Sequence, residues 1–335
     1  MAAISGANPI VASDVNNFTG ELFKITPHRT PLLAAAGGLN GGNAINSTFF
    51  QFQTQDNAVI SSVTPDDEGG SPNYSGRSRA SLQGVLQAAS GEIVPFDLAG
   101  NYKNGDPALA LAGTSPINDE LAYQMELVLE QVAKKVEWAA FNATYADGTS
   151  GNRQMRGLKA HQDLSGGNSV NNDDGAGTPA AQKINWDIIA SAMKTLYDAG
   201  APMRQPVLFV SPTMLLDLNK ELIKATVGSV NYGILPRDRN IGGVDIDTVV
   251  TPFGSIGLAL SDVLPAGTIS GSKQAFIVDL SFVKPVFLNI PGYGTMFVRD
   301  LDQNDQARIA KAVYMEMAFD FGPQQYHCAI DNVVG

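Results

Sequence analysis

Cysteine is almost absent from this sequence, and charged side chains are scarce. Cys328 is the single cysteine in the 335 residues, so no disulfide bond can form within a chain. That composition fits a protein assembled in a reducing compartment. Charged residues make up 16% of the chain, against roughly a quarter in an ordinary globular protein. Small polar residues take their place, which indicates a surface that neighbouring molecules largely cover.

Basic side chains are the minority among these few charges, and the formal net charge at pH 7 is -11. Binding duplex DNA through one face of a protein requires clustered lysine and arginine that neutralise phosphates, so this charge argues against that function. It does not argue against a position beside DNA, because an acidic wall repels DNA and leaves it free to slide.

The sequence also lacks targeting segments and long hydrophobic runs. Met1–Pro9 has neither the basic nor the apolar region of a signal peptide. No stretch reaches the roughly 18 consecutive apolar residues that a transmembrane helix needs. We therefore expect no membrane partner.

Motifs of catalysis and cofactor binding are missing as well. The chain has no glycine-rich phosphate-binding loop, and Gly254-Ser255-Ile256-Gly257 lacks the spacing of a nucleophile elbow. The three histidines, His28, His161 and His327, have no catalytic or metal-ligating partner near them in the sequence. We predict no catalytic residue, no cofactor and no metal, although sequence distance does not exclude a triad or a carboxylate pair assembled by the fold.

Two further features invite a chemical interpretation, and we favour a structural one for both. His327-Cys328 stands near the end of the sequence without a second cysteine or ligand cluster, so we expect a buried, inert thiol. Asp173 and Asp174 lie in the polar segment Asp163–Pro179, whose composition predicts a surface loop. Their spacing matches no calcium-binding loop, so we expect no metal there.

The sequence opens with the features of an arm followed by a hairpin. Residues 1–44 combine a short helical pattern with a proline-rich stop and the apolar run Leu32–Ala36, which is too short to form its own core. Residues 45–62 and 82–94 alternate like strands on either side of a turn rich in proline and glycine. We predict a long hairpin over 45–101. Its exposed tip carries acidic and basic residues on opposite sides: Asp66, Asp67, Glu68, Arg77 and Arg79.

The clearest helix signal starts at Ser115. Ser115 is a good N-cap, Pro116 suits the first helical position, and acidic residues follow in the first turn. Apolar residues then recur at steps of three and four from Ile117 to Ala139, which places them on one helix face. We predict a long helix over about 115–146 that packs on the core by this face.

A compact α/β unit is predicted over 184–281. Asn185 caps a helix that ends at Gly200, Pro206–Val210 is a short buried strand, and Ser211-Pro212 starts a second helix. A loop is expected after this helix, at 228–243. Three strands are expected after the loop, at 244–250, 256–260 and 275–279.

The last part of the sequence, 282–335, is rich in strand patterns. Val283–Ile290 and Tyr293–Val298 show two of them, and Arg308–Phe321 alternates with apolar residues on one face. Pro323 ends this long strand. For the chain as a whole we predict an α+β fold.

The order of these parts resembles the capsid fold of the Hong Kong phage type, which tailed bacteriophages share with bacterial encapsulins. Three stretches resemble that family in detail: Ile25–Leu33 in the arm, Met155–Leu158, and the helix–strand–helix around Pro206–Ser211. The resemblance covers nearly the whole chain. It implies a major capsid protein of a tailed bacteriophage, which is structural and not an enzyme, and which self-assembles into an icosahedral shell around double-stranded DNA.

The resemblance also implies a division into domains: an N-terminal arm at 1–44, an extended hairpin loop at 45–101, and a peripheral domain with a spine helix at 102–183. An axial domain would span 184–281, and 282–335 would hold the return strands of the peripheral domain and the C-terminus. Contacts between subunits would use the hairpin tip and a loop of the axial domain. The residues expected in these contacts are Asp66, Asp67, Glu68, Arg77, Arg79, Arg237, Asp238 and Arg239.

The partners implied are sister subunits in hexamers and pentamers, a portal, a decoration protein and a scaffolding protein, with DNA enclosed without sequence-specific binding. We expect the scaffold to be a separate protein, because the sequence begins almost directly with the arm. Assembly would take place in the cytoplasm of the bacterial host and yield the virion capsid. Family members that crosslink their shells join a hairpin lysine to a neighbour's asparagine. No lysine lies between Lys24 and Lys103, so we predict no covalent link through the hairpin.

Three other classes of protein stay open. An encapsulin would have the same fold and enclose protein cargo instead of a genome. A β-rich extracellular or tail adhesion protein would share the low charge and the many Asn and Gly residues, although the amphipathic helix at 115–146 counts against it. The third alternative is a hydrolase of unrecognised type.

Overall fold

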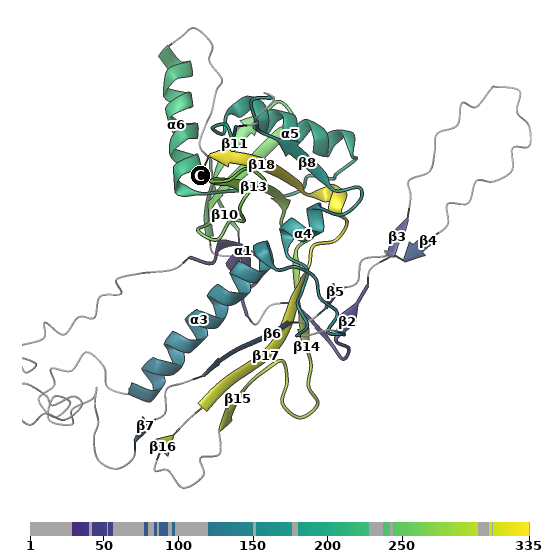
Figure 1. Ribbon diagram of the computed structural model, residues 1–335, viewed down its shortest axis with the longest axis vertical. Helices are drawn as coiled ribbons and strands as arrows, with labels where there is room; N and C mark the ends of the chain where they lie inside the picture. Colours follow the sequence, from purple (N-terminus) through teal and green to yellow (C-terminus); the bar gives the residue numbers. More distant parts are fainter. Residues whose placement is uncertain are drawn as a thin grey trace, which may run out of the picture.

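The structure is a computed structural model that describes residues 29–39, 42–51, 53–55, 77–79, 84–85, 87–92, 96–97, 120–149, 152–175, 180–227, 237–241, 244–300, 308–309 and 311–334. Within these ranges, two larger sheets and five α-helices make up most of the regular structure (Figure 1). The predicted α+β class is therefore confirmed.

The larger sheet has seven strands in the order β10-β11-β12-β9-β13-β18-β8. β9 is its central strand, and all five of its apolar residues are buried. β9 runs parallel to β12 and antiparallel to β13. The strands are β8 (Asn168–Asn171), β9 (Pro206–Val210), β10 (Arg237–Ile241), β11 (Val244–Thr251), β12 (Gly254–Leu260), β13 (Ser272–Asp279) and β18 (Cys328–Val334).

Two helices of this unit begin and end where the sequence predicts. The Asn185 side chain accepts a hydrogen bond from Ile188 N at 2.8 Å and so caps α5 (Trp186–Asp198). Gly200 follows the end of that helix with a φ of 73°, in the left-handed region that glycine adopts most easily. Ser211 Oγ accepts a hydrogen bond from Met214 N at 3.3 Å at the start of α6 (Pro212–Val227).

The second sheet has five strands and is built around β17 (Lys311–Asp320). β14 (Lys284–Leu288) and β15 (Met296–Asp300) pair with successive parts of β17, and β6 (Gln87–Glu92) pairs with it too. β1 (Asn43–Ile45) runs parallel to β14. The residues predicted to face inward on the long strand are buried: Val313, Met315, Met317 and Phe319. Glu316 and Ala318 on the opposite face are buried as well, so burial does not alternate over the second half of the strand.

The predicted long helix is present as α3 (Glu120–Asn142), which packs beside β6 and β17 (Figure 1). Its expected start near Ser115 lies outside the described residues. It ends at Asn142 and not near Ala146, so the expected end was wrong. The Ala143 carbonyl accepts a hydrogen bond from Gly157 N at 2.8 Å. Ala146 exchanges backbone hydrogen bonds with Gln154. The backbone groups of Ala143 and Ala146 that would extend the helix are therefore bonded to the following loop. The short helix α4 (Leu158–Gln162) comes after that loop.

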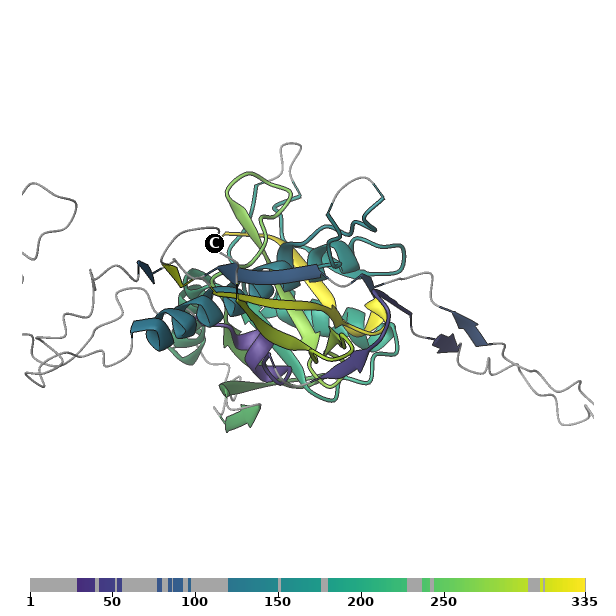
Figure 2. The same ribbon diagram turned by 90° about the horizontal axis from the view of Figure 1, so that it is seen from below.

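A hairpin begins beside the second sheet, where β5 (Gly84–Val85) contacts β17, and its pair of β3 (Gln53–Gln55) and β4 (Arg77–Arg79) stands away from both sheets (Figures 1 and 2). β2 (Phe49–Phe50) pairs with β5, and β3 pairs with β4, both antiparallel. Antiparallel pairing of the two predicted arms is confirmed for these two short pairs. The predicted extent of the hairpin to residue 101 was wrong, because β6 pairs with β17 and Phe96–Asp97 pairs with Arg308–Ile309. A short pair of β7 (Phe96–Asp97) and β16 (Arg308–Ile309) lies elsewhere, beyond the end of β17.

The sheet pairing differs from the expected division at 183/184 and 281/282. β8 comes before residue 184 and β18 comes after residue 281, yet both belong to the seven-stranded sheet. β18 pairs antiparallel with β13 and parallel with β8. The sequence reveals local strand patterns but not which distant strands pair, so the return of the chain into this sheet was missed. No helix among the described residues has both the length and the apolar character that a bilayer crossing requires.

Candidate assembly surfaces

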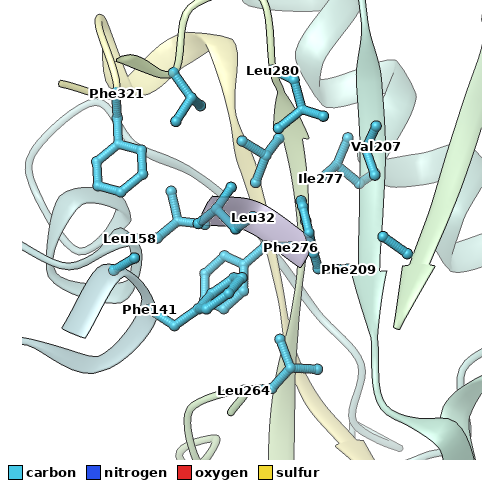
Figure 3. Close-up of a cluster of buried hydrophobic side chains, with 14 of the residues drawn as sticks. Leu32, Phe141, Leu158, Val207, Phe209, Leu264, Phe276, Ile277, Leu280 and Phe321 are labelled. Carbon is cyan, nitrogen blue, oxygen red and sulfur yellow. The ribbon is translucent and has the colours of Figure 1, made fainter. Parts of the chain in front are cut away.

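The arm is anchored in the core by a single helical turn, α1 (Pro31–Ala35). Leu32 and Leu33 are 0% and 2% exposed. In Figure 3, Leu32 lies among Phe141, Leu158 and Phe276. The apolar run in the arm therefore packs on the body of its own subunit.

Glu137 of α3 holds this turn in place. Its Oε1 accepts a hydrogen bond from Leu32 N at 3.0 Å, and its Oε2 accepts one from Leu33 N at 2.8 Å. These amides belong to the first turn of α1, where helical N–H groups have no intrahelical partner. Glu137 is 1% exposed, and this burial raises the pKa of its carboxyl to about 7, although the two N–H groups act in the opposite direction. A glutamate beside the apolar stripe of a helix carries no sequence signal for this role.

The charged hairpin tip is only partly within the described residues. Arg77 and Arg79 lie on β4, at register positions opposite Gln55 and Gln53. Asp66, Asp67 and Glu68 lie outside the described residues. The predicted contacts of these residues with other subunits remain predictions.

Arg237, Asp238 and Arg239 lie on strand β10, so the prediction that they lie in a loop was wrong. β10 pairs antiparallel with β11 from Arg237↔Thr248 to Ile241↔Val244. β10 is also the last strand of its sheet among the described residues.

The predicted inertness of the buried histidine and cysteine side chains agrees with their surroundings. His327 Nδ1 accepts a hydrogen bond from Asp279 N at 3.2 Å, and Nε2 lies 2.6 Å from the Phe321 carbonyl oxygen. This pairing fits a neutral ring that donates from Nε2, and burial lowers the pKa of His327. Burial raises the pKa of the Cys328 thiol to about 12, so the reactive thiolate is disfavoured.

Asp173 and Asp174 of the polar segment form local hydrogen bonds. Asp173 accepts hydrogen bonds from Asn171 Nδ2 at 2.6 Å and Gly175 N at 3.0 Å. Asp174 Oδ1 accepts one from Ala180 N at 3.0 Å. Within the described ranges, no three His, Cys, Asp or Glu side chains come together in a way that could hold a metal ion.

One polar contact escaped the sequence analysis. Glu316 on β17 is 6% exposed, and its Oε2 lies 2.9 Å from Nη2 of Arg153. The Tyr314 hydroxyl donates a hydrogen bond to Oε1 of the same carboxylate. Arg153 lies in the loop after α3, so this contact fastens that loop to the second sheet. The partners are 163 residues apart, a separation that no local pattern can bridge.

The family comparison agrees with this architecture. A family model described as SU10 major capsid protein matches residues 4–334. The chain belongs to this family. It is therefore a structural subunit of a capsid shell, and the resemblance to phage capsid proteins is confirmed. No curated protein matches the sequence.

Solved structures with the same fold include viral capsids and an encapsulin. The cyanophage A-1(L) capsid protein is 10% identical with a TM-score of 0.61, and the match covers 96% of this chain and 97% of that chain. The capsid protein of Myoviridae phage XM1 is 11% identical with a TM-score of 0.55, covering 98% and 100%. The SrpI encapsulin of Synechococcus elongatus is 13% identical with a TM-score of 0.56, covering 93% and 92%. At these identities the likeness shows the fold alone.

Proposed function

We propose that this capsid protein assembles as hexamers and pentamers into an icosahedral shell that encloses double-stranded DNA. The match to a family of major capsid proteins over residues 4–334 is the observation that carries the proposal. A net charge of -11 supports enclosure of the DNA without sequence-specific binding, because an acidic wall does not hold phosphates. The protein takes no part in catalysis and needs neither a cofactor nor a metal.

Different parts of the subunit would make different contacts in the shell. The arm (1–44) and the hairpin reach neighbouring subunits, α3 is the spine of the peripheral domain, and the seven-stranded sheet is the core of the axial domain. Asp66, Asp67 and Glu68 on one side of the hairpin tip, and Arg77 and Arg79 on the other, set the register between neighbours more than the affinity. The burial of Leu32 and Leu33 supports an arm that stays attached to its own subunit at residue 31.

Assembly would take place in the cytoplasm of the bacterial host. The further partners are a separate scaffolding protein, a portal and a decoration protein. Many modest contacts per subunit suffice for a stable shell, because each subunit that joins a closed ring makes several of them at once.

The test is the content of particles purified from infected cells. After nuclease treatment, we expect protected double-stranded DNA of one uniform length. The likeness to the SrpI encapsulin favours a second candidate, a shell for protein cargo. Particles with no protected DNA and a constant ratio of one enzyme to shell protein would identify that alternative and refute DNA enclosure.

The shell is held together without a covalent link through the hairpin. No lysine lies between Lys24 and Lys103, so this part of the chain has no amine that could attack an asparagine. We expect a single band at the subunit mass when mature particles are boiled in detergent and run on a denaturing gel. A ladder of multimers whose crosslinked peptides include residues 45–101 would contradict this.

A further inference from the structure

The two larger sheets are connected at a place where two segments of the chain pass side by side. The first segment leads from β13 to β14, and the second leads from β17 through the 3-10 helix η2 (Gln324–Tyr326) to β18. The rings of Phe282 and Tyr326, one from each segment, have their centroids 4.7 Å apart. Whatever holds these two segments together also fixes the position of one sheet against the other.

His327 bonds to both segments from a buried position. Its Nδ1 accepts a hydrogen bond from Asp279 N, at the end of β13, at 3.2 Å. Its Nε2 lies 2.6 Å from the carbonyl oxygen of Phe321 in the second segment, and the residue is 0% exposed. A neutral imidazole can make both bonds, whereas an imidazolium carries a proton on each nitrogen and accepts none. Protonation of His327 therefore breaks the bond to Asp279.

His161 of α4 is a second buried imidazole beside this connection, because α4 packs against β18 (Figure 1). Its ring centroid lies 6.2 Å from that of His327 and 5.6 Å from that of Phe321. The Nε2 atom of His161 is buried and has no hydrogen-bond partner among the described residues. Burial, with the neighbouring His327 and Arg156, lowers the pKa of His161 to about 3. A proton on this ring is therefore unfavourable while the cluster stays closed.

Neutral amide groups close the connection on its outer side. Gln162 Nε2 at the end of α4 donates a hydrogen bond to the Gln324 carbonyl at 3.1 Å. Gln324 Nε2 donates to the Ser165 carbonyl at 2.9 Å, and Asn168 Nδ2 donates to the Gln325 carbonyl at 2.7 Å. These bonds tie α4 and the turn after it to η2. Amides do not titrate, so these bonds give the connection no pH dependence of their own.

Three charged groups lie around the two rings in the described part of the chain. Arg156 opposes a proton on His161. Asp279 favours a proton on His327, but burial is the larger effect and lowers the pKa of that ring. Burial raises the pKa of Asp320 at the end of β17, so this carboxyl binds its proton more readily in the closed form and opposes opening in acid. The histidines are thus the groups that acid sets against the closed form.

We infer that His161 and His327 form an acid-sensitive joint, which opens when the two rings take up protons and frees the two sheets to turn against each other. In the open joint the rings reach water, where imidazole binds a proton below about pH 6.5. Acid therefore favours the open form, and each ring that takes up a proton adds to the effect. The joint lies within one subunit, so the inference does not depend on what the shell encloses.

Hydrogen exchange of full-length, unassembled subunits tests the joint. The amides of Asp279 and His327 donate to His327 Nδ1 and to the Gln324 carbonyl, and they lose these partners when the joint opens. After correction for the intrinsic pH dependence of exchange, their protection should fall at least about a hundredfold from about pH 7.5 to about pH 4.5. His161 alone accounts for this factor, because each pH unit below its ordinary pKa of 6.5 favours the open form about tenfold. Amides of β9 should keep their protection, since the sheets themselves stay folded.

Substitutions of the rings show which protons act. His161→Phe keeps an aromatic ring against Phe321 and cannot titrate, so the decline in protection should shrink about a hundredfold. Adding His327→Asn leaves an amide oxygen for Asp279 N, and protection should then no longer fall in acid. His28→Phe removes the remaining histidine of the sequence. It is the matched control and should behave like wild type.

Every outcome supports or refutes the joint. Level protection of the Asp279 amide in wild type, or an undiminished decline in His161→Phe, would refute it. An equal decline of the β9 amides would show that acid unfolds the whole subunit, which also refutes a local joint. If the variant with His327→Asn does not fold, the comparison of His161→Phe with His28→Phe still decides, because only His161→Phe should reduce the decline.

Discussion

The buried carboxylate of Glu137 predicts that docking of the arm depends on pH. In the docked subunit burial raises its pKa from the ordinary 4.5 to about 7, and we expect undocking of α1 to return the carboxyl to water. Between these values the docked form binds a proton that the undocked form releases. Docking is therefore strongest at low pH and weakens as the pH rises through this window. A rise in pKa from 4.5 to about 7 corresponds to about 3 kcal/mol.

Two substitutions separate the charge from the hydrogen bonds. Glu137→Gln keeps one carbonyl oxygen for Leu32 N or Leu33 N and cannot ionise, so docking of the arm should become independent of pH between 5 and 8. Glu137→Ala leaves both amides buried without an acceptor, at about 1–3 kcal/mol each. Glu126→Gln, at an exposed position of the same helix, is the matched control and should keep the pH dependence of the wild type.

Hydrogen exchange of the Leu32 and Leu33 amides, followed by mass spectrometry on unassembled subunits, measures docking directly. After correction for the intrinsic pH dependence of exchange, protection should fall by on the order of a hundredfold from pH 5 to pH 8 in wild type. It should stay level in Glu137→Gln. Protection that rises with pH in wild type, or the same decline in Glu137→Gln, would refute the reasoning.

Three further predictions concern the stability of the subunit. Gly157→Ala should cost about 2 kcal/mol or more in urea unfolding, because a Cβ would lie 2.6 Å from Ala143 N; an unchanged midpoint would contradict the tight approach. Arg153→Met should cost about 1–3 kcal/mol by leaving the Glu316 carboxylate unpaired, and adding Glu316→Gln should recover most of it; equal losses in the single and double variants would rule out the pair. Burial lowers the pKa of His161 from 6.5 to about 3, so its stability contribution is present above pH 6.5 and lost as pH falls toward 3. His161→Phe should reduce the loss of stability between pH 6.5 and 4.5, and an unchanged loss would show that this ring does not titrate with unfolding.

Local features of the fold could be predicted because they depend on neighbours in the sequence. The Asn185 cap and the Gly200 end of α5 follow from which backbone groups lack partners at helix ends. The apolar alternation of β17 predicts its buried face, since successive residues of a strand point to opposite sides.

Features that depend on distant residues escaped prediction. β18 returns to the seven-stranded sheet because β13 and β8 offer pairing partners far away in the sequence. α3 stops at Asn142 because Gly157, a residue of the following loop, bonds to Ala143. Glu137 looks like any helix glutamate until α1 places two free amides against it. The place of Arg237, Asp238 and Arg239 on a strand became visible only when the pairing of β10 with β11 was known.

The central claim is that this chain builds a closed shell from copies of itself, and electron microscopy tests it most directly. The protein would be expressed alone and together with a candidate scaffolding protein, purified, and imaged in negative stain. We predict rings of subunits or closed shells of uniform diameter in at least one of the two preparations. Small uniform oligomers in both preparations, with no rings and no shells, would contradict the account.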